Sequence, residues 1–379
     1  MRSFLLAFAL SLPAAALAPS TASAQPVTAT LRAMLGHLPD PTGFEGATID
    51  FGDMARARAV AAGWDFPRGT DSALAQFRGM PPGDLARSLR DPATDWRETV
   101  GFGPGDIAQV IALQAPPNSA QIIRLTPGVI EAVGPALQAT GYALQTGQGV
   151  TAWARGEDHA MDMRNRNRDD PFDGGMGLSA RVQIEGDLLR HARAWEMSAA
   201  LADAASRPAA ARPDIAALLD ALDGAATDLP EAALIFAMLL PEAATLGLPP
   251  PFAMLTASDP PREDATPDWI SAVLADLANG PGEAAVLAVS IALPDAATAE
   301  ALRARIETAW AERPSESDGR SYGERLGVPA RVAAHDAGGG LWVLSVTVET
   351  GAGEDRRRTL AMDALYSGAM RGDLVFMAP

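Results

Sequence analysis

The sequence of 379 residues contains no cysteine and no lysine, and all 30 of its basic residues are arginine. Without cysteine the chain cannot form a disulfide, a thiol nucleophile, an iron–sulfur cluster or a thiolate zinc site. Without lysine it cannot form a Walker A phosphate loop, a pyridoxal Schiff base or the Ser-x-x-Lys acyl-transfer apparatus, because each requires that amine. These absences exclude several large classes of enzyme.

Histidine is also scarce, and no two histidines have the His-Glu-x-x-His spacing of a zinc protease. The four are His37, His159, His191 and His335. His159 and His191 each lie one helical turn from an aspartate, Asp162 and Asp187 respectively. Such a pair presents two metal ligands together only if the segment is helical. We therefore expect no metal site and no cofactor.

The first 24 residues predict a signal peptide. Arg2 provides a positive charge, and the apolar run from Phe4 to Ala18 is too short to cross a bilayer comfortably. Small residues precede the predicted cleavage between Ala24 and Gln25. No arginine pair or lipid-accepting cysteine accompanies the run, so we expect Sec export and release as a periplasmic or secreted protein. An uncleaved N-terminal anchor is the alternative; otherwise the mature chain has no membrane span.

Acidic residues dominate the charge balance, with 47 Asp and Glu against 30 Arg and a formal net charge of −17. Such a chain repels phosphate backbones and anionic membrane surfaces, so we expect no nucleic-acid partner. Its hydrophobic content of 48% is typical of a globular protein, and its length suggests about two domains.

Hydrophobic periodicity in the N-terminal block predicts the order strand, helix, strand, strand, helix, strand. The elements are expected at 47–53, 54–63, 107–114, 120–125, 126–141 and 149–156. Asp53 suits the N-cap of the first helix. This is the βαββαβ order of a ferredoxin-like unit, with helical insertions after the first helix.

The C-terminal block predicts the same order. A strand at 283–293 precedes a helix capped by Asp295, and a hairpin, a helix at 359–370 and a last strand at 374–378 follow. In the second hairpin strand four apolar residues alternate and predict one buried face: Trp342, Leu344, Val346 and Val348. The repeated order suggests a duplicated ferredoxin-like architecture; two unrelated α+β halves are the alternative.

We therefore expect an α+β protein with domains at 25–163 and 179–379, joined by a polar connector at 164–178. The second domain includes a helical region at 194–278, in which the apolar spacing of 267–277 predicts an amphipathic helix. The short apolar run at 231–241 favours a buried strand instead.

The connector contains the most polar patch of the chain, RNRNRDDPFDGG at 164–175. Aligned as an EF-hand loop from Asp169, it places Ala180 where the calcium-binding glutamate is required, so calcium does not fit.

Three alternate arginines of this patch, Arg164, Arg166 and Arg168, could present forked donors to a carboxylate, which makes them the candidate ligand or partner site. The competing interpretation is a solvated linker in which Asp169 and Asp170 neutralise these arginines.

Three functions remain open. The first is a non-catalytic periplasmic protein that binds an envelope protein or a small ligand; it rests on export and on the absence of a nucleophile, metal or phosphate motif. The second is a periplasmic hydrolase that uses Asp or Glu as acid and base, because such pairs need no sequence motif. An assembly subunit is a third possibility, which would form concentration-dependent oligomers.

Overall fold

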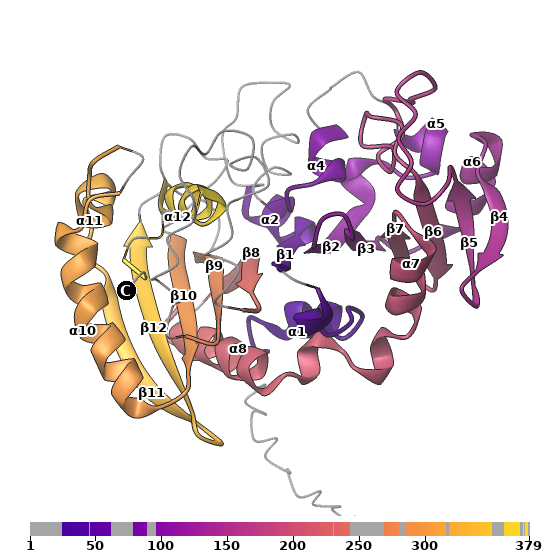
Figure 1. Cartoon of the computed structure of the whole chain (residues 1–379). Helices are drawn as coiled ribbons and strands as arrows, with labels where there is room; N and C mark the ends of the chain where they lie inside the picture. Colours follow the sequence, from indigo (N-terminus) through magenta and orange to yellow (C-terminus); the bar gives the residue numbers. More distant parts are fainter. Residues whose placement is uncertain are drawn as a thin grey trace, which may run out of the picture.

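A computed structural model describes residues 25–44, 46–61, 79–88, 96–229, 231–242, 269–279, 285–315, 318–350, 360–371, 374 and 376–377 (Figure 1). The predicted signal peptide, including Ala24, lies outside the described residues. None of the described helices is both long enough and apolar enough to cross a membrane. The chain is a mixed α+β protein built on one large antiparallel sheet.

Twelve strands form this sheet in the order β11-β12-β10-β9-β8-β1-β2-β3-β7-β6-β5-β4. Their bounds are β1 Thr48–Asp53, β2 Ile107–Gln114, β3 Ala120–Leu125, β4 Ala143–Gly147, β5 Val150–Arg155, β6 Ala180–Glu185, β7 Leu188–Ala192, β8 Ala232–Leu240, β9 Ser271–Asn279, β10 Ala285–Leu293, β11 Arg331–Gly338 and β12 Leu341–Thr350. Every pairing between these strands is antiparallel.

The expected pair of ferredoxin-like units is not confirmed, although β12 lies between β10 and β11 and so gives the C-terminal half one split βαβ arrangement. In a split βαβ motif the third strand lies between the two strands that flank the helix, whereas β1 pairs directly with β2 and its other neighbour is β8. Each half instead begins as a meander, β1-β2-β3 or β8-β9-β10. A helix then connects the third strand of the meander to a later group of strands. The last strand of that group, β7 in the N-terminal half and β12 in the C-terminal half, pairs with the third strand of the meander. The halves thus share an order of connections that differs from the predicted one.

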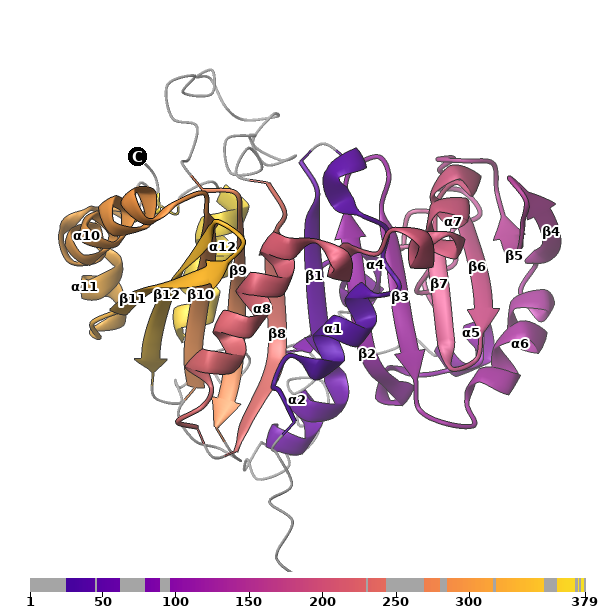
Figure 2. The ribbon, with the colours of Figure 1, turned by 90° about the horizontal axis from the view of Figure 1, so that it is seen from below.

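Helices cover both faces of the sheet. On one face lie α1 (Ala29–Leu35), α7 (Trp195–Ala202) and α8 (Pro213–Ala225) (Figure 2). The other face carries α2 Met54–Ala61, α4 Asp84–Ser88, α5 Trp96–Val100, α6 Val133–Ala139, α10 Ala296–Glu312, α11 Tyr322–Leu326 and α12 Leu360–Arg371. Successive strand residues point to opposite faces, and in β8 Leu239 packs with α8 while Met238 and Leu240 pack with α10 and α12.

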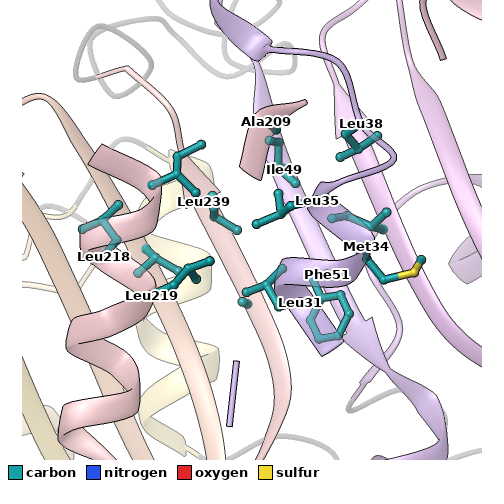
Figure 3. Packing of buried hydrophobic residues seen from close by; sticks show 14 of the residues in the cluster. Leu31, Met34, Leu35, Leu38, Ile49, Phe51, Ala209, Leu218, Leu219 and Leu239 are labelled. Atoms are coloured by element: carbon teal, nitrogen blue, oxygen red, sulfur yellow. The ribbon is translucent and has the colours of Figure 1, made fainter. Parts of the chain in front are cut away.

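The halves join through β1 and β8, with Ile49 opposite Leu239 and Phe51 opposite Ala237. Figure 3 shows Leu31 and Leu35 of α1 close to these strands, and Leu218 and Leu219 of α8 beside them. All of these side chains are buried, so the seam between the halves is part of one continuous core.

Local sequence signals were reliable at the helix starts. The Asp53 carboxylate accepts the Arg56 N–H at 2.9 Å, and the Asp295 carboxylate accepts the Thr298 N–H at 2.8 Å, which confirms both predicted caps. The predicted hairpins β2–β3 and β11–β12 are also confirmed. In β12, Trp342 packs on the same side as Leu344, Val346 and Val348, although it is only half-buried.

The region expected to be helical at 194–278 contains two strands. The run at 231–241 is β8, as predicted, but the expected amphipathic helix at 267–277 is largely β9. In β9, Ala272 and Leu274 face one core cluster while Val273 and Ala275 face another. A strand buried on both faces loses the polar alternation that marks a strand in sequence.

Two strands, β4 and β7, were not anticipated, and the expected last strand does not form in the described part of 374–378, where Phe376 and Met377 lie in a turn. The predicted connector at 164–178 lies between β5 and β6, which are adjacent strands of the same sheet. The sheet is therefore continuous on both sides of it.

Candidate functional site in the loop between β5 and β6

The polar patch belongs to a long loop from Gly156 to Ser179 that closes on itself at its base. Met161 and Leu178 form an isolated antiparallel bridge, and the Asp162 N–H donates to the Gly177 carbonyl at 2.7 Å. Arg181 of β6 fastens the start of the loop, since its guanidinium donates to the Gly156 carbonyl at 2.9 Å and to Asp158 at 2.6 Å. These contacts fix both ends of the loop.

The two inner aspartates of the patch are buried. Asp170 is 0% exposed, and its carboxylate accepts hydrogen bonds from Tyr142 Oη at 2.8 Å, Arg155 Nη1 at 2.7 Å and the Phe172 N–H at 2.8 Å. Asp173 is 1% exposed and lies 3.2 Å from Arg155 Nη2. One guanidinium from β5 therefore serves both carboxylates: Nη1 donates a hydrogen bond to Asp170, and Nη2 forms an ion pair with Asp173 without a hydrogen bond.

Asp173 also organises the loop backbone. Its carboxylate accepts the Asn167 N–H at 2.7 Å and the Gly177 N–H. The amide oxygen of Asn167 in turn accepts the Asp169 N–H at 3.1 Å. The loop residues between these anchors are held by side chains of the loop itself, because its backbone has no ladder partner there.

Burial sets the protonation of the groups around Asp170. Burial, followed by the charge of Asp170, raises the pKa of Tyr142 well above 10.0, so Tyr142 remains a hydrogen-bond donor. Burial also raises the pKa of Asp170 against the opposing effects of Arg155 and Tyr142. The Arg155 guanidinium lies 4.8 Å from the centroid of the Tyr142 ring, which adds a cation–π contact.

His191 lies beneath the loop, on β7. Its ring is 4.8 Å from that of Phe172, and its Nδ1 is 3.4 Å from the Gln121 amide nitrogen. Burial, together with Arg193, Arg155 and Arg181, lowers the pKa of His191 well below 6.5, so the imidazole is neutral at pH 7. Because β7 is a strand, His191 and Asp187 are not on one helix face, and no metal-ligand group is found among the described residues.

The outer half of the loop carries the arginines of the candidate site. Arg164, Arg166 and Arg168 are all exposed, and within the described structure their guanidinium groups have no hydrogen bond or ion pair. The expectation that Asp169 and Asp170 neutralise them is wrong for Asp170, because Asp170 is buried against Arg155. Three cationic side chains are therefore presented to solvent.

The turn that carries these arginines is fixed by Asp162. Its Oδ1 accepts the N–H groups of Arg164 at 3.1 Å and Asn165 at 3.2 Å, and its Oδ2 accepts the Asn165 side-chain amide at 2.8 Å. The Asn165 hydrogen bonds lower the pKa of Asp162, so the carboxylate keeps its charge at neutral pH. The acidic and amide side chains hold the backbone, and the arginines point outward.

Two methionines flank the arginines at the start of the turn. Met161 is 54% exposed and Met163 is 48% exposed. Large apolar side chains at this exposure are rare among the described residues; the others are Leu144 of β4 and Ile184 of β6. Two exposed apolar side chains are thus followed by three exposed cationic ones along the segment Met161 to Arg168.

The buried aspartate pair offers no acid–base site. Both carboxylates are inaccessible and already bind Arg155, Tyr142 or backbone N–H groups, so neither could reach a substrate. The pair is part of the framework of the loop.

The expectation that the sequence holds no nucleophile motif is wrong in one respect, because a Gly-x-Ser-x-Gly spacing, typical of serine hydrolases, occurs at Gly319 to Gly323. Ser321 is 2% exposed and caps α11: its Oγ accepts the Glu324 N–H at 3.1 Å, and Glu324 accepts the Ser321 N–H at 3.1 Å. This is a capping box, not a nucleophile on a turn after a strand.

The three arginines were predicted as a site from the sequence, but the residues that position them were not. Asp170 and Asp173 were within the quoted patch, whereas Tyr142 and Arg155 come from outside it. The proline and paired aspartates between two strands were a signal of a structured loop.

No protein-family model matches the sequence, and no curated protein matches it. A solved structure described as "Structure of crystal form I of TP0453" aligns with 89% of this chain and 98% of its own, at 9% sequence identity and a TM-score of 0.35.

Proposed function

We propose that this protein is a non-catalytic binding protein that recognises an acidic partner protein through the exposed segment Met161–Arg168. The observation that carries the proposal is that Arg164, Arg166 and Arg168 are exposed without ion-pair partners in the described structure. Arginine and methionine are enriched at protein interfaces, and this segment presents both.

Charge supports an acidic partner. The chain has a net charge of −17, so most of the surface of this protein repels a partner with exposed carboxylates. The unpaired arginines provide a local positive patch that orients such a partner toward one loop.

Preorganisation also supports recognition by this loop. Asp162 fixes the turn, and Asp173 with Asn167 fixes the following residues, so little backbone freedom is lost on binding. The arginines lie on an open surface, which suits the face of a protein better than an enclosed small ligand. The predicted signal peptide supports a periplasmic or extracellular location for this interaction.

A charge-matched comparison tests the proposal. Binding of a fluorescently labelled poly-glutamate peptide to the mature protein is measured for the wild type and for two triple Arg→Gln variants. One variant changes Arg164, Arg166 and Arg168; the control changes Arg207, Arg303 and Arg331, which are all ion-paired elsewhere. Both variants alter the net charge by the same amount.

We expect the loop variant to lose about tenfold in affinity, because three exposed charge pairs at roughly 0.5 kcal/mol each amount to about that factor. The control should keep the affinity of the wild type. Equal weakening of both variants would show that only bulk charge matters, and the absence of any binding by the wild type would refute the acidic-partner proposal.

The contribution of the methionines is separable. Replacing Met161 and Met163 by Ser should weaken binding while leaving its salt dependence unchanged, because salt screens charge and not apolar contact. A changed salt dependence would mean that the methionines act only by positioning the arginines.

A further inference from the structure

The two edges of the sheet differ in how they are protected. Natural edge strands avoid pairing with other chains by means of charges, prolines, bulges or covering segments. The β11 edge has such features: Arg331 forms an ion pair with Glu349, His335 and Asp336 are exposed, and the register shifts between Asp336 and Gly338.

Among the residues that the structure describes, the β4 edge has none of these features. Residues 132–154, which include α6, β4 and all of β5 except its last residue, Arg155, contain no charged side chain in a chain that is 20% charged. β4 has no proline and pairs with β5 without a register shift. Ala143 to Thr146 are all exposed, and Leu144 is 60% exposed.

The hairpin geometry shows which backbone groups this edge presents. Gln148 and Gly149 both have positive φ, 52° and 79°, which is the type I′ turn of a two-residue hairpin. In that geometry Gly147 and Val150 form a hydrogen-bonded pair, so Leu144 and Thr146 fall in non-hydrogen-bonded pairs. The N–H and C=O groups of Leu144 and Thr146 therefore point away from β5. The contact of 3.0 Å between the hydroxyls of Thr146 and Thr151 agrees with this, because side chains approach closely in such pairs.

We propose that β4 is a dimerisation edge, at which β4 of one copy pairs antiparallel with β4 of a second copy and joins the two sheets. Two copies that each carry a charge of −17 repel one another over most of their surface, and the charge-free end is where they approach at least cost. Pairing of β4 with itself is two-fold symmetric and closes after two subunits. The protected β11 edge prevents head-to-tail pairing with β4, which would form an open fibre.

Size-exclusion chromatography with light scattering, over a dilution series of the full mature chain, tests this proposal. We expect a dimer that dissociates on dilution and becomes tighter as salt screens the repulsion between copies. Leu144→Lys places a charge on the edge, and Thr146→Pro removes an outward N–H without removing a bond to β5. Both should be monomeric. Ala333→Lys adds the same charge to the exposed β11 edge and should remain dimeric.

Circular dichroism and the thermal midpoint separate loss of dimer from loss of fold, and Leu144→Lys should leave the folded spectrum unchanged because the residue is exposed. A wild type that is monomeric at every concentration overturns the proposal, even if β4 binds a strand of another protein. So does a dimer that persists in both β4 variants.

Discussion

The two ends of the sheet are stabilised by different means. At the C-terminal end, Trp310 of α10, Tyr322 of α11 and Phe376 pack with their ring centroids 5.0 to 5.6 Å apart over an apolar face of β10 and β12. At the N-terminal end, the core also contains a buried ionic group, formed by Arg155, Asp170 and the neighbouring Asp173.

The apolar core of the C-terminal end and the ionic group of the N-terminal end contribute differently to the structure. Apolar packing has no strong directional preference, so it stabilises a sheet without specifying the shape of a loop. A hydrogen-bonded and ion-paired polar group costs more to bury, but its directional contacts fix the orientation of its members. The large exposed apolar side chains of the described residues also lie at the N-terminal end, where the loop and the β4 edge are.

Breaking the ionic group should have the largest effect. Arg155→Ala leaves two buried carboxylates without their cation, and the free energy of unfolding should fall by about 3–5 kcal/mol. An Arg-specific protease should then cut at Arg164, Arg166 or Arg168 much faster than in the wild type. Asp170→Asn should lower the free energy of unfolding by less in the Arg155→Ala variant than in the wild type. In that variant the substitution removes a buried negative charge that has already lost its cation. Equal costs in both backgrounds would contradict the coupling of these two residues.

At the C-terminal end, Trp342→Ala should lower the free energy of unfolding by about 2 kcal/mol. A fully buried tryptophan costs about 3–5 kcal/mol on truncation, and Trp342 is only half-buried. Trp310→Ala, at 3% exposed, is the matched comparison and should show the full cost. Equal denaturant midpoint shifts for the two variants would contradict this difference in burial.

Acid should destabilise the N-terminal end through His191. Its pKa is lowered in the folded state, so the unfolded chain binds a proton first as the pH falls below about 6.5, and stability is lost from there downward. The slope contributed by one such histidine is at most about 1.4 kcal/mol per pH unit. His191→Gln should make the free energy of unfolding less dependent on pH between pH 6.5 and the lowered pKa of His191. His335→Gln, at an exposed position of β11, is the control variant and should leave the pH dependence of the wild type unchanged.

The smallest effect on stability is expected from the three exposed arginines. Replacing Arg164, Arg166 and Arg168 by Gln should change the free energy of unfolding by less than about 0.5 kcal/mol, because no ion pair is lost in the described structure. A large loss in chemical denaturation would mean that the arginines hold the loop and are not free for a partner.

Local chemistry made parts of this fold predictable. The caps Asp53 and Asp295 and the hairpin β11–β12 depend on neighbours in sequence, and all were predicted correctly. β4 was missed because its residues are exposed and do not alternate between apolar and polar. β9 was mistaken for a helix because both of its faces are buried.

The features of the candidate site also divide into those that the sequence determines and those that depend on the tertiary structure. The sequence alone determined the chemical classes that lack of cysteine and lysine excludes, the acidic character of the chain and the presence of three closely spaced arginines. Only the tertiary structure decided that Asp170 and Asp173 turn inward to Arg155 and leave those arginines without a partner in the described residues. The reason is physical: an ion pair depends on distance in space, and Arg155 reaches the aspartates only because β5 and β6 lie side by side.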